Sequence, residues 1–152
     1  MQETKPELLT GEVFERISKQ WMLITAGPEK NCNTMTASWG GLGILWGKPV
    51  STIYIRPQRY TRQFVDDKES FTLSFFSQDY RKQLSLCGSK SGRDIDKVKE
   101  CGFTVAQAEC GAPYFEEAEL VLVCRKRYAQ EMDPQAIPQD AKDRFYPEKD
   151  YH

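Results

Sequence analysis

Short apolar or alternating runs, each closed by a glycine or proline, recur along the chain. Their period of two, or their compact apolar character, predicts strands at 21–26, 33–39, 49–56, 70–76, 103–107 and 119–125. The last run is continuously apolar, so we expect that strand to be buried on both faces. Short strands separated by turn signals indicate a mainly β protein with antiparallel pairing.

Apolar positions spaced three and four apart predict short helices outside the sheet. These helices are expected at 60–68, 79–87 and 94–101, with a further short one at 140–145. Thr61 is the expected N-cap of the first helix, and Gly88 and Gly102 are expected to end the second and third. Two turns are also expected, at 28–31 and at 111–115.

The stretch from residue 33 to residue 50 combines a polar strand with a cluster of glycines. Alternation places Thr34, Thr36 and Ser38 on one face of the strand. Glycines at 40, 41, 43 and 47 follow, where we expect sharp turns and close approach of a backbone or a flat ligand. Two interpretations stay open from these residues alone: a site for a planar cofactor with a polar edge, or a strand that leads into an ordinary turn.

Basic residues next to two expected helix starts form a candidate phosphate site. Arg56 and Arg59 precede the helix that begins near Thr61, where free N–H groups and the helix dipole favour an anion. The loop 89–93 offers backbone amides and Lys90 before the next helix. The alternatives are solvated arginines beside an ordinary helix cap, and a flexible connector.

Composition limits the classes of function. A chain of 152 residues corresponds to one domain, 1–152, and a net charge of −1 from 21 basic and 22 acidic residues favours neither nucleic acid nor an anionic membrane as a partner. No apolar run approaches the roughly 20 residues that cross a bilayer, and the first residues contain no apolar signal region. The sequence therefore predicts a cytoplasmic protein.

Cysteine and histidine content argues against several kinds of chemistry. The five cysteines are odd in number and contain no C-x-x-C pair, which disfavours a disulfide framework and a zinc site. We expect them to be small apolar residues, with Cys32 the one nearest the candidate strand. The single histidine is His152, so catalysis by an internal histidine base is excluded. Any redox chemistry is then expected to rest on a cofactor.

Several motifs together resemble those of a known family. The segments N-T-M-T-A-S-W-G-G-L-G, W-G-K-P-V, Y-I-R-P-Q-R-Y-T and F-T-L-S-F-F occur in this order. In order and spacing they resemble the flavoredoxin-type branch of the flavin reductase-like family, and the similarity continues weakly through S-G-R-D-I-D-K-V and P-Y-F-E-E-A. The resemblance implies an FMN-binding split β-barrel with antiparallel, Greek-key-like strands.

The resemblance also implies which residues bind the cofactor. Thr36 and Ser38, with backbone amides through Trp39, would follow the polar edge of the isoalloxazine ring, and Trp39 would form a wall. The phosphate would be held by the segment from Arg56 to Thr61, with Lys90 in addition. The full set of expected cofactor-binding residues is Asn33, Thr36, Ala37, Ser38, Trp39, Arg56, Arg59, Tyr60, Thr61, Ser89 and Lys90. None is expected to be catalytic, because the flavin carries the chemistry.

The function implied is an FMN-containing oxidoreductase that takes a hydride from NADH or NADPH and reduces a small-molecule or protein acceptor. The alternatives are an FMN-binding electron carrier without a nicotinamide site, and an interaction protein whose flavin pocket has decayed. Because the sequence contains no G-x-G-x-x-G fingerprint, a nicotinamide would bind transiently against the flavin.

A homodimer with FMN near the subunit boundary is the expected assembly. The resemblance implies it, and 3 Trp, 7 Tyr and 8 Phe exceed the obvious needs of a barrel interior. Candidates for the interface are Trp39, Trp46, Tyr114 and Phe115. The resemblance further implies a barrel strand beyond His152, so we expect the barrel to be completed by additional chain or by the partner subunit.

Overall fold

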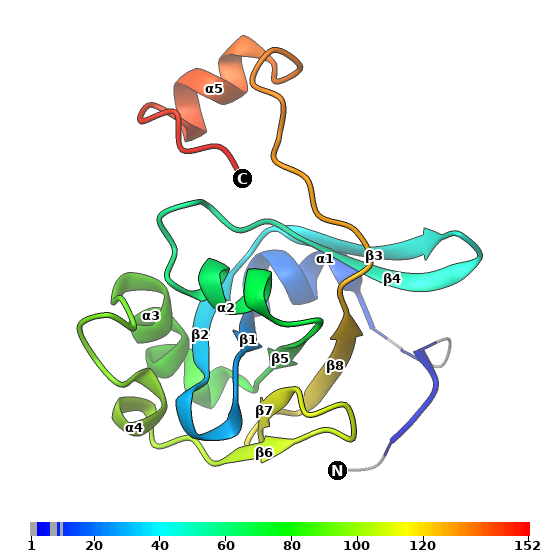
Figure 1. Cartoon of the computed structure of the whole chain (residues 1–152), viewed down its shortest axis with the longest axis vertical. Helices are drawn as coiled ribbons and strands as arrows, with labels where there is room; N and C mark the ends of the chain where they lie inside the picture. The colour runs from blue at the N-terminus through cyan, green and yellow to red at the C-terminus, as the bar shows by residue number, and fades with distance from the viewer. Residues whose placement is uncertain (1–2, 7–8, 10) are drawn as a thin grey trace.

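A four-stranded antiparallel sheet lies at the centre of the molecule (Figure 1). The computed structural model describes residues 3–6, 9 and 11–152. The sheet has the order β2-β1-β5-β8, and two separate antiparallel hairpins, β3-β4 and β6-β7, accompany it. The strands are β1 (Met22–Ala26), β2 (Asn33–Ala37), β3 (Gly40–Leu45), β4 (Lys48–Ile53), β5 (Ser70–Phe75), β6 (Val105–Gln107), β7 (Pro113–Phe115) and β8 (Leu120–Arg125). All six predicted strands form.

Short helices flank the sheet, and one lies away from it near the C-terminal end of the chain (Figure 1), so the protein is mixed α/β with mostly antiparallel strands. They are α1 (Val13–Glu15), α2 (Thr61–Asp67), α3 (Arg81–Ser89), α4 (Lys97–Cys101) and α5 (Gln139–Phe145). A π-helical turn (Arg16–Gln20) extends α1, and 3-10 turns occupy Glu29–Asn31 and Gln78–Tyr80. No helix in the described part of the chain has the length and apolar character to cross a bilayer.

Alternation along the central strands separates two hydrophobic clusters, one on each face of the sheet. On one face the strand register places Met35, Ile24, Leu73 and Leu122 in a row across all four strands. On the other face, Leu23 belongs to the cluster that also contains Leu84 and Cys87 of α3, with Phe76, Phe103, Phe115 and Ala118. Because α3 packs on this second face, the position of β2 relative to α3 is fixed by burial of apolar surface.

The glycine-rich stretch after β2 was predicted as a turn, and this is wrong for most of it. Residues 40–45 form strand β3, which pairs with β4 through a two-residue turn at Trp46 and Gly47. Both turn residues have positive φ, 51° and 67°, as in the type I′ turns that match strand twist. The predicted close backbone approach does occur at Gly40, where a Cβ atom would lie 2.7 Å from the Thr52 carbonyl oxygen.

Helix ends also differ from the predictions. Thr61 is the first residue of α2, and the N-cap is Tyr60. Gly88 lies inside α3, because the helix continues to Ser89. The third predicted helix begins only at Lys97, after an N-cap at Asp96 whose carboxylate accepts the Lys99 amide. Gly102 ends α4 with φ 68°, as predicted.

Two predictions for the second half of the chain, a strand buried on both faces and a turn, differ from the structure. Strand β8 is an edge strand in which every residue is half-buried or exposed, so it is not buried on both faces as predicted; Val123 is 51% exposed. The expected turn at 111–115 contains strand β7 from Pro113 onward. Phe115 in that strand is completely buried in this chain, so it is not available to an interface between subunits.

Candidate functional site

Two parts of the predicted phosphate segment meet the first residue of β2. The side-chain amide of Asn33 donates a hydrogen bond of 2.9 Å to the Thr61 hydroxyl, and both residues are buried. Thr61 therefore uses its hydroxyl to fix β2 against α2 rather than to cap its own helix. Tyr60 packs edge-on against Phe64 of the same helix, with ring centroids 5.0 Å apart. The predicted residues Asn33, Tyr60 and Thr61 are thus brought together.

The loop after α3 packs against these residues, a contact that the sequence did not predict. The guanidinium of Arg93 lies 4.6 Å from the centroid of the Tyr60 ring and donates to the Gln58 carbonyl. Gly92 fits against Asn33 so closely that a Cβ atom would lie 2.0 Å from the Asn33 side-chain oxygen and 3.1 Å from the Tyr60 ring. The loop can therefore approach β2 only because residue 92 has no side chain.

Arg59 reaches from the same segment to the end of α3. It donates a hydrogen bond of 2.9 Å to the Gly88 carbonyl, and no ion pair of Arg59 occurs in the part of the chain that the structure describes. Burial, followed by repulsion from Arg56, lowers the pKa of Arg59. A half-buried cation without a counter-charge favours an anionic ligand such as a phosphate.

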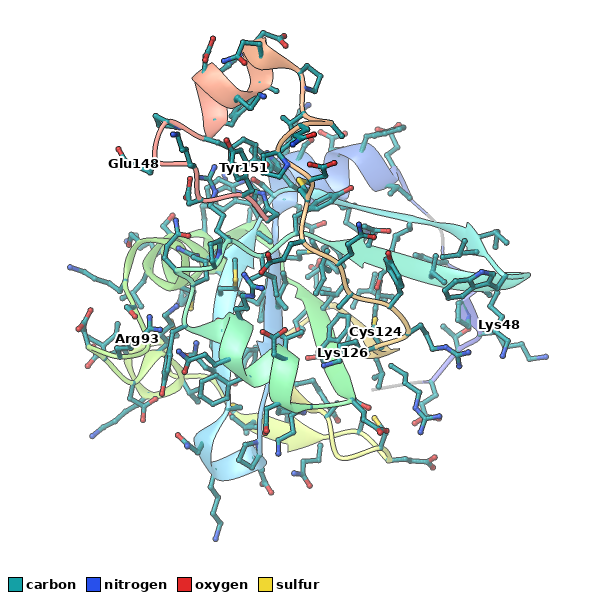
Figure 2. The ribbon with its side chains drawn as sticks, turned by 45° about the horizontal axis from the view of Figure 1, so that its top comes forward. Lys48, Arg93, Cys124, Lys126, Glu148 and Tyr151 are labelled. Carbon is teal, nitrogen blue, oxygen red and sulfur yellow. The ribbon has the colours of Figure 1, made fainter. Side chains whose placement is uncertain are left out.

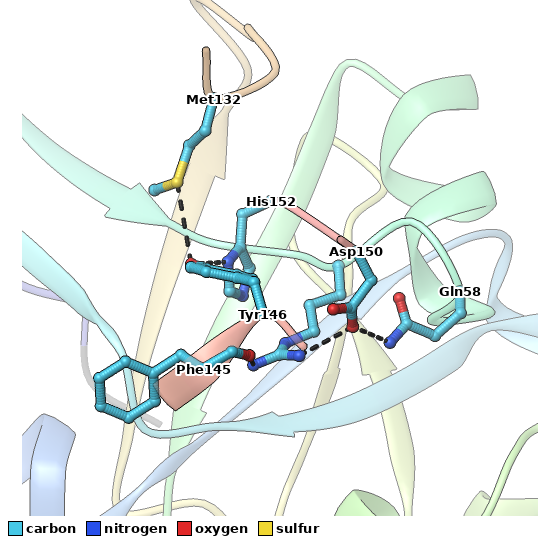
Figure 3. A network of polar contacts seen from close by, with 7 residues as sticks. Gln58, Met132, Phe145, Tyr146, Asp150 and His152 are labelled. Carbon is cyan, nitrogen blue, oxygen red and sulfur yellow. Dashed lines mark hydrogen bonds and ion pairs between the residues drawn. The ribbon is translucent and has the colours of Figure 1, made fainter. Parts of the chain in front are cut away.

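Arg56, three residues earlier, is already neutralised by the C-terminal segment (Figure 3). Its guanidinium donates to the Asp150 carboxylate at 2.8 Å and to the Phe145 carbonyl at 2.9 Å, and the Gln58 amide donates to the same carboxylate. The hydrogen bond from Arg56 is the largest cause that lowers the pKa of Asp150. Arg56 is therefore less able than Arg59 to attract a further anion.

Trp39 belongs to the same C-terminal contact. Its ring meets Phe145 edge-on at 5.2 Å and lies 5.4 Å from the His152 ring, while the Arg56 guanidinium lies 6.0 Å from it. Burial is the main cause that lowers the pKa of His152, followed by the charge of Arg56. Trp39, predicted as a wall of the cofactor pocket, therefore packs against Phe145 and His152 of this chain.

The middle of β2 presents its backbone edge rather than a row of hydroxyls. Thr34 is buried and hydrogen-bonded to Thr25, and Thr36 donates its hydroxyl proton to the Leu84 carbonyl of α3. Because β2 is an edge strand, alternate backbone groups point away from β1; the Thr34 carbonyl does so and accepts Lys97 at 2.8 Å. The backbone of Thr36 has the same outward direction and can pair with a planar, polar-edged ligand.

The other predicted residues contribute less. Ala37 is buried, so only its backbone can reach a ligand, and Ser38 is half-buried beyond the end of β2. Ser89 bonds back to the Leu86 carbonyl, and Lys90 is exposed after α3. The predictions missed Gln58, Gly88, Gly92 and Arg93, although the S-G-R-D segment contained a signal for the last two. We call Asn33, Arg59, Tyr60, Thr61, Gly88, Gly92 and Arg93 the β2–α3 site.

A second surface lies across the molecule from this site (Figures 1 and 2). The β3-β4 hairpin projects from the sheet, and a groove of about 860 Å³ lies between β4, β8, α2 and residues 126–132. None of the predicted cofactor residues lines this groove. Exposed apolar side chains lie along this groove and on the adjoining hairpin. We call them the hairpin face: Ile44 (73% exposed), Leu45, Trp46 (64%), Val123 and Tyr128. In Figure 2, Arg93 and Lys48 mark the two opposite sides.

This chain matches one protein-family model and shares its fold with several solved structures. A family model described as "Flavin reductase like domain" matches residues 14–137. Among curated proteins, none has a sequence significantly similar to this chain.

Solved structures with the same fold include flavoredoxin from Methanosarcina acetivorans, with 24% identity, a TM-score of 0.64 and coverage of 75% of this chain and 59% of the other. An FMN-binding protein from Thermus thermophilus has 19% identity, a TM-score of 0.65 and coverage of 88% and 71%. The Streptomyces globisporus C-1027 NADH:FAD oxidoreductase has 16% identity, a TM-score of 0.60 and coverage of 75% and 65%. This chain thus spans about three fifths of the length of the flavoredoxin.

Proposed function

Because the chain belongs to the flavin reductase-like family, we propose that it binds FMN at the β2–α3 site and acts as a flavin-dependent oxidoreductase. The observation that carries this proposal is Arg59, a half-buried guanidinium that donates to the Gly88 carbonyl and lies near a second arginine. An FMN phosphate would offset that charge. Bound FMN would supply hydride and single-electron transfer, which side chains perform poorly.

The residues of the site divide into two roles. Arg59 would hold the phosphate, with amides of the 89–93 loop as further donors, because the Arg62 and Gln63 amides at the start of α2 already donate to the Arg59 and Tyr60 carbonyls. The outward backbone groups of β2 around Thr36 would pair with the polar edge of the ring system. The Thr36 hydroxyl can accept a hydrogen bond there but not donate one while its proton is held by Leu84. Asn33, Thr61 and Gly92 position these elements.

NADH or NADPH is the proposed electron donor, and a flavin, an iron–sulfur protein or another small molecule or protein is the acceptor. The Streptomyces neighbour, an NADH:FAD oxidoreductase, supports the nicotinamide. The second candidate is an FMN-binding electron carrier without a nicotinamide site. It is supported by the flavoredoxin neighbour.

We also propose a homodimer in which the hairpin face is covered by a second copy, completing the split barrel that the family resemblance implies. Exposed Trp46 and Ile44 on a projecting hairpin support this assignment, because aromatic and apolar residues are enriched at the cores of subunit interfaces. Trp39 is 39% exposed and can contribute, whereas Phe115 is excluded by its burial within the chain.

Absorption spectra of the purified protein test the proposal. The expected result is an oxidised-flavin spectrum after addition of FMN and gel filtration, followed by bleaching when NADH or NADPH is added without oxygen. Retained FMN that bleaches with dithionite but with neither nicotinamide would identify the electron carrier instead. A protein that retains no FMN would contradict both functions.

A further inference from the structure

Two thiols from neighbouring helices are in contact beneath the β2–α3 site. Cys87 lies in α3 and Cys101 is the last residue of α4, and their sulfur atoms are 3.6 Å apart. Cys87 is completely buried, while Cys101 is half-buried. No other pair of thiols is in contact within the described residues. All five cysteines are free in this structure.

A buried lysine sits beside this pair. The Lys97 ammonium is 5% exposed and donates hydrogen bonds of 2.8 Å to the Cys87 carbonyl and to the Thr34 carbonyl of β2. Its own pKa is lowered to about 8 by burial. Lys97 therefore ties α4 to α3 and to β2, and it places a positive charge near both sulfur atoms.

The two thiols are not equivalent. The hydrogen bond from Cys87, and then the charge of Lys97, lower the pKa of the Cys101 thiol, while burial and Glu100 oppose this effect. The pKa of Cys87 is raised by the same hydrogen bond and by burial. Cys101 thus combines access with thiolate character, the two properties that make a cysteine reactive, and Cys87 is the protected neighbour.

We propose that Cys87 and Cys101 form a redox pair that a hydroperoxide converts reversibly into a disulfide. The Cys101 thiolate attacks one peroxide oxygen, the O–O bond breaks, and a sulfenic acid and hydroxide are formed when the oxidant is hydrogen peroxide. The Cys87 sulfur then attacks the sulfenic sulfur, so that the S–S bond forms, the S–O bond breaks and water leaves. Two electrons pass from the thiols to the peroxide, and a dithiol such as dithiothreitol returns them.

Disulfide formation requires the sulfur atoms to close from 3.6 Å to roughly 2.05 Å. Helix α4 has five residues and ends at once in Gly102, so only a short element must shift. The bond would tie α4 to the part of α3 that contains Gly88, the residue whose carbonyl accepts Arg59. Neither thiol belongs to the proposed flavin-binding set, so the reaction does not depend on FMN.

Peptide mapping of the whole chain tests the pair. The reduced protein is treated with limiting hydrogen peroxide, blocked with iodoacetamide in urea, and digested with trypsin and a Glu-specific protease. Cleavage after Lys82, Lys90, Glu100 and Glu109 isolates Cys87 in peptide 83–90 and Cys101 in peptide 101–109, with Cys110 in a separate peptide. The expected major product is the 83–90/101–109 disulfide, which dithiothreitol removes.

Matched variants separate the pair from general oxidation. Cys110→Ser, at an exposed lone cysteine, should leave the rate of disulfide formation within about twofold, because Cys110 has no part in it. Cys101→Ser should leave Cys87 fully alkylated at the peroxide concentration that oxidises the parent protein. The proposal is overturned if Cys101 in the parent protein proceeds to sulfinic acid while Cys87 remains alkylatable, or if Cys110 is oxidised before the 83–90/101–109 disulfide appears.

Discussion

The β2–α3 site and the hairpin face lie on opposite sides of the molecule and differ in how closely each is packed by other residues of the chain. In the β2–α3 site the polar groups of Asn33 and Thr61 satisfy each other, and Gly92 leaves no room for a side chain. On the hairpin face Trp46 is exposed, and a Cβ atom at Gly43 would meet nothing within 4 Å. The first surface is closely packed, whereas the second leaves apolar side chains exposed, as interaction surfaces do.

The largest expected effect comes from filling the crowded glycine. Gly92→Ala should lower the free energy of unfolding by about 2 to 4 kcal/mol, because the new methyl group displaces Asn33 and breaks its bond to Thr61. Gly43→Ala, in open space within β3, should not lower it and should raise it by at most about 1 kcal/mol, because alanine loses less backbone freedom than glycine on folding. Urea denaturation without flavin measures both, and equal effects would remove the distinction between the two surfaces.

The next effect concerns the hairpin face. Trp46→Ala should weaken the proposed dimer by about 30-fold or more, since exposed tryptophans at interfaces commonly contribute about 2 kcal/mol. Lys48→Ala, two residues along the same hairpin, is the control and should change dimer affinity only a few-fold. Sedimentation equilibrium measures the constant. If the parent protein is monomeric, or if Trp46→Ala leaves the dimer affinity unchanged, the hairpin face has another role.

The smallest effect concerns the C-terminal segment that lies against Trp39 and Arg56. Burial lowers the pKa of His152 below its ordinary value of 6.5 when the segment is docked. At pH values between these two pKa values, His152 binds a proton in the undocked segment but not in the docked one. Docking should therefore weaken as pH falls below 6.5. Because His152 is the single histidine, its NMR signals can be followed directly, and a midpoint below 6.5 is expected. A midpoint at or above 6.5 would show that the segment is not docked in solution.

The parts of the fold that the sequence predicted correctly are those with a local periodic pattern of apolar residues. Alternating apolar residues identified the strands because burial on one face requires them, as in the row through Ile24 and Leu73. Strand β3 was missed because glycines have no side chains to alternate. Gly88 was read as a helix stop, but α3 continues through it where the helix packs against Thr36, a tertiary contact that sequence alone does not reveal.

The candidate site divides in the same way. Arg59, Tyr60 and Thr61 lie on one short segment, so their proximity could be predicted. The hydrogen bond from Asn33 to Thr61 joins residues 28 positions apart and has no local signal, although the family resemblance placed both residues in the site. The pairing of Arg56 with Asp150 joins residues 94 positions apart and has no local signal. For that reason the sequence does not distinguish Arg56 from Arg59. Of these two arginines, Arg56 alone has an acidic partner among the described residues.

FMN and riboflavin affinities of the parent protein, Arg59→Ala and Arg56→Ala test the assignment of the flavin site most directly. A charge-assisted phosphate contact is worth about 1.5 to 3 kcal/mol, so Arg59→Ala should weaken FMN binding by roughly 10- to 100-fold and leave riboflavin binding unchanged. Arg56→Ala should have a smaller effect on FMN, because Asp150 already neutralises that arginine. Equal losses of FMN and riboflavin affinity in Arg59→Ala, or equal affinities of the parent protein for the two ligands, would contradict a phosphate site at Arg59.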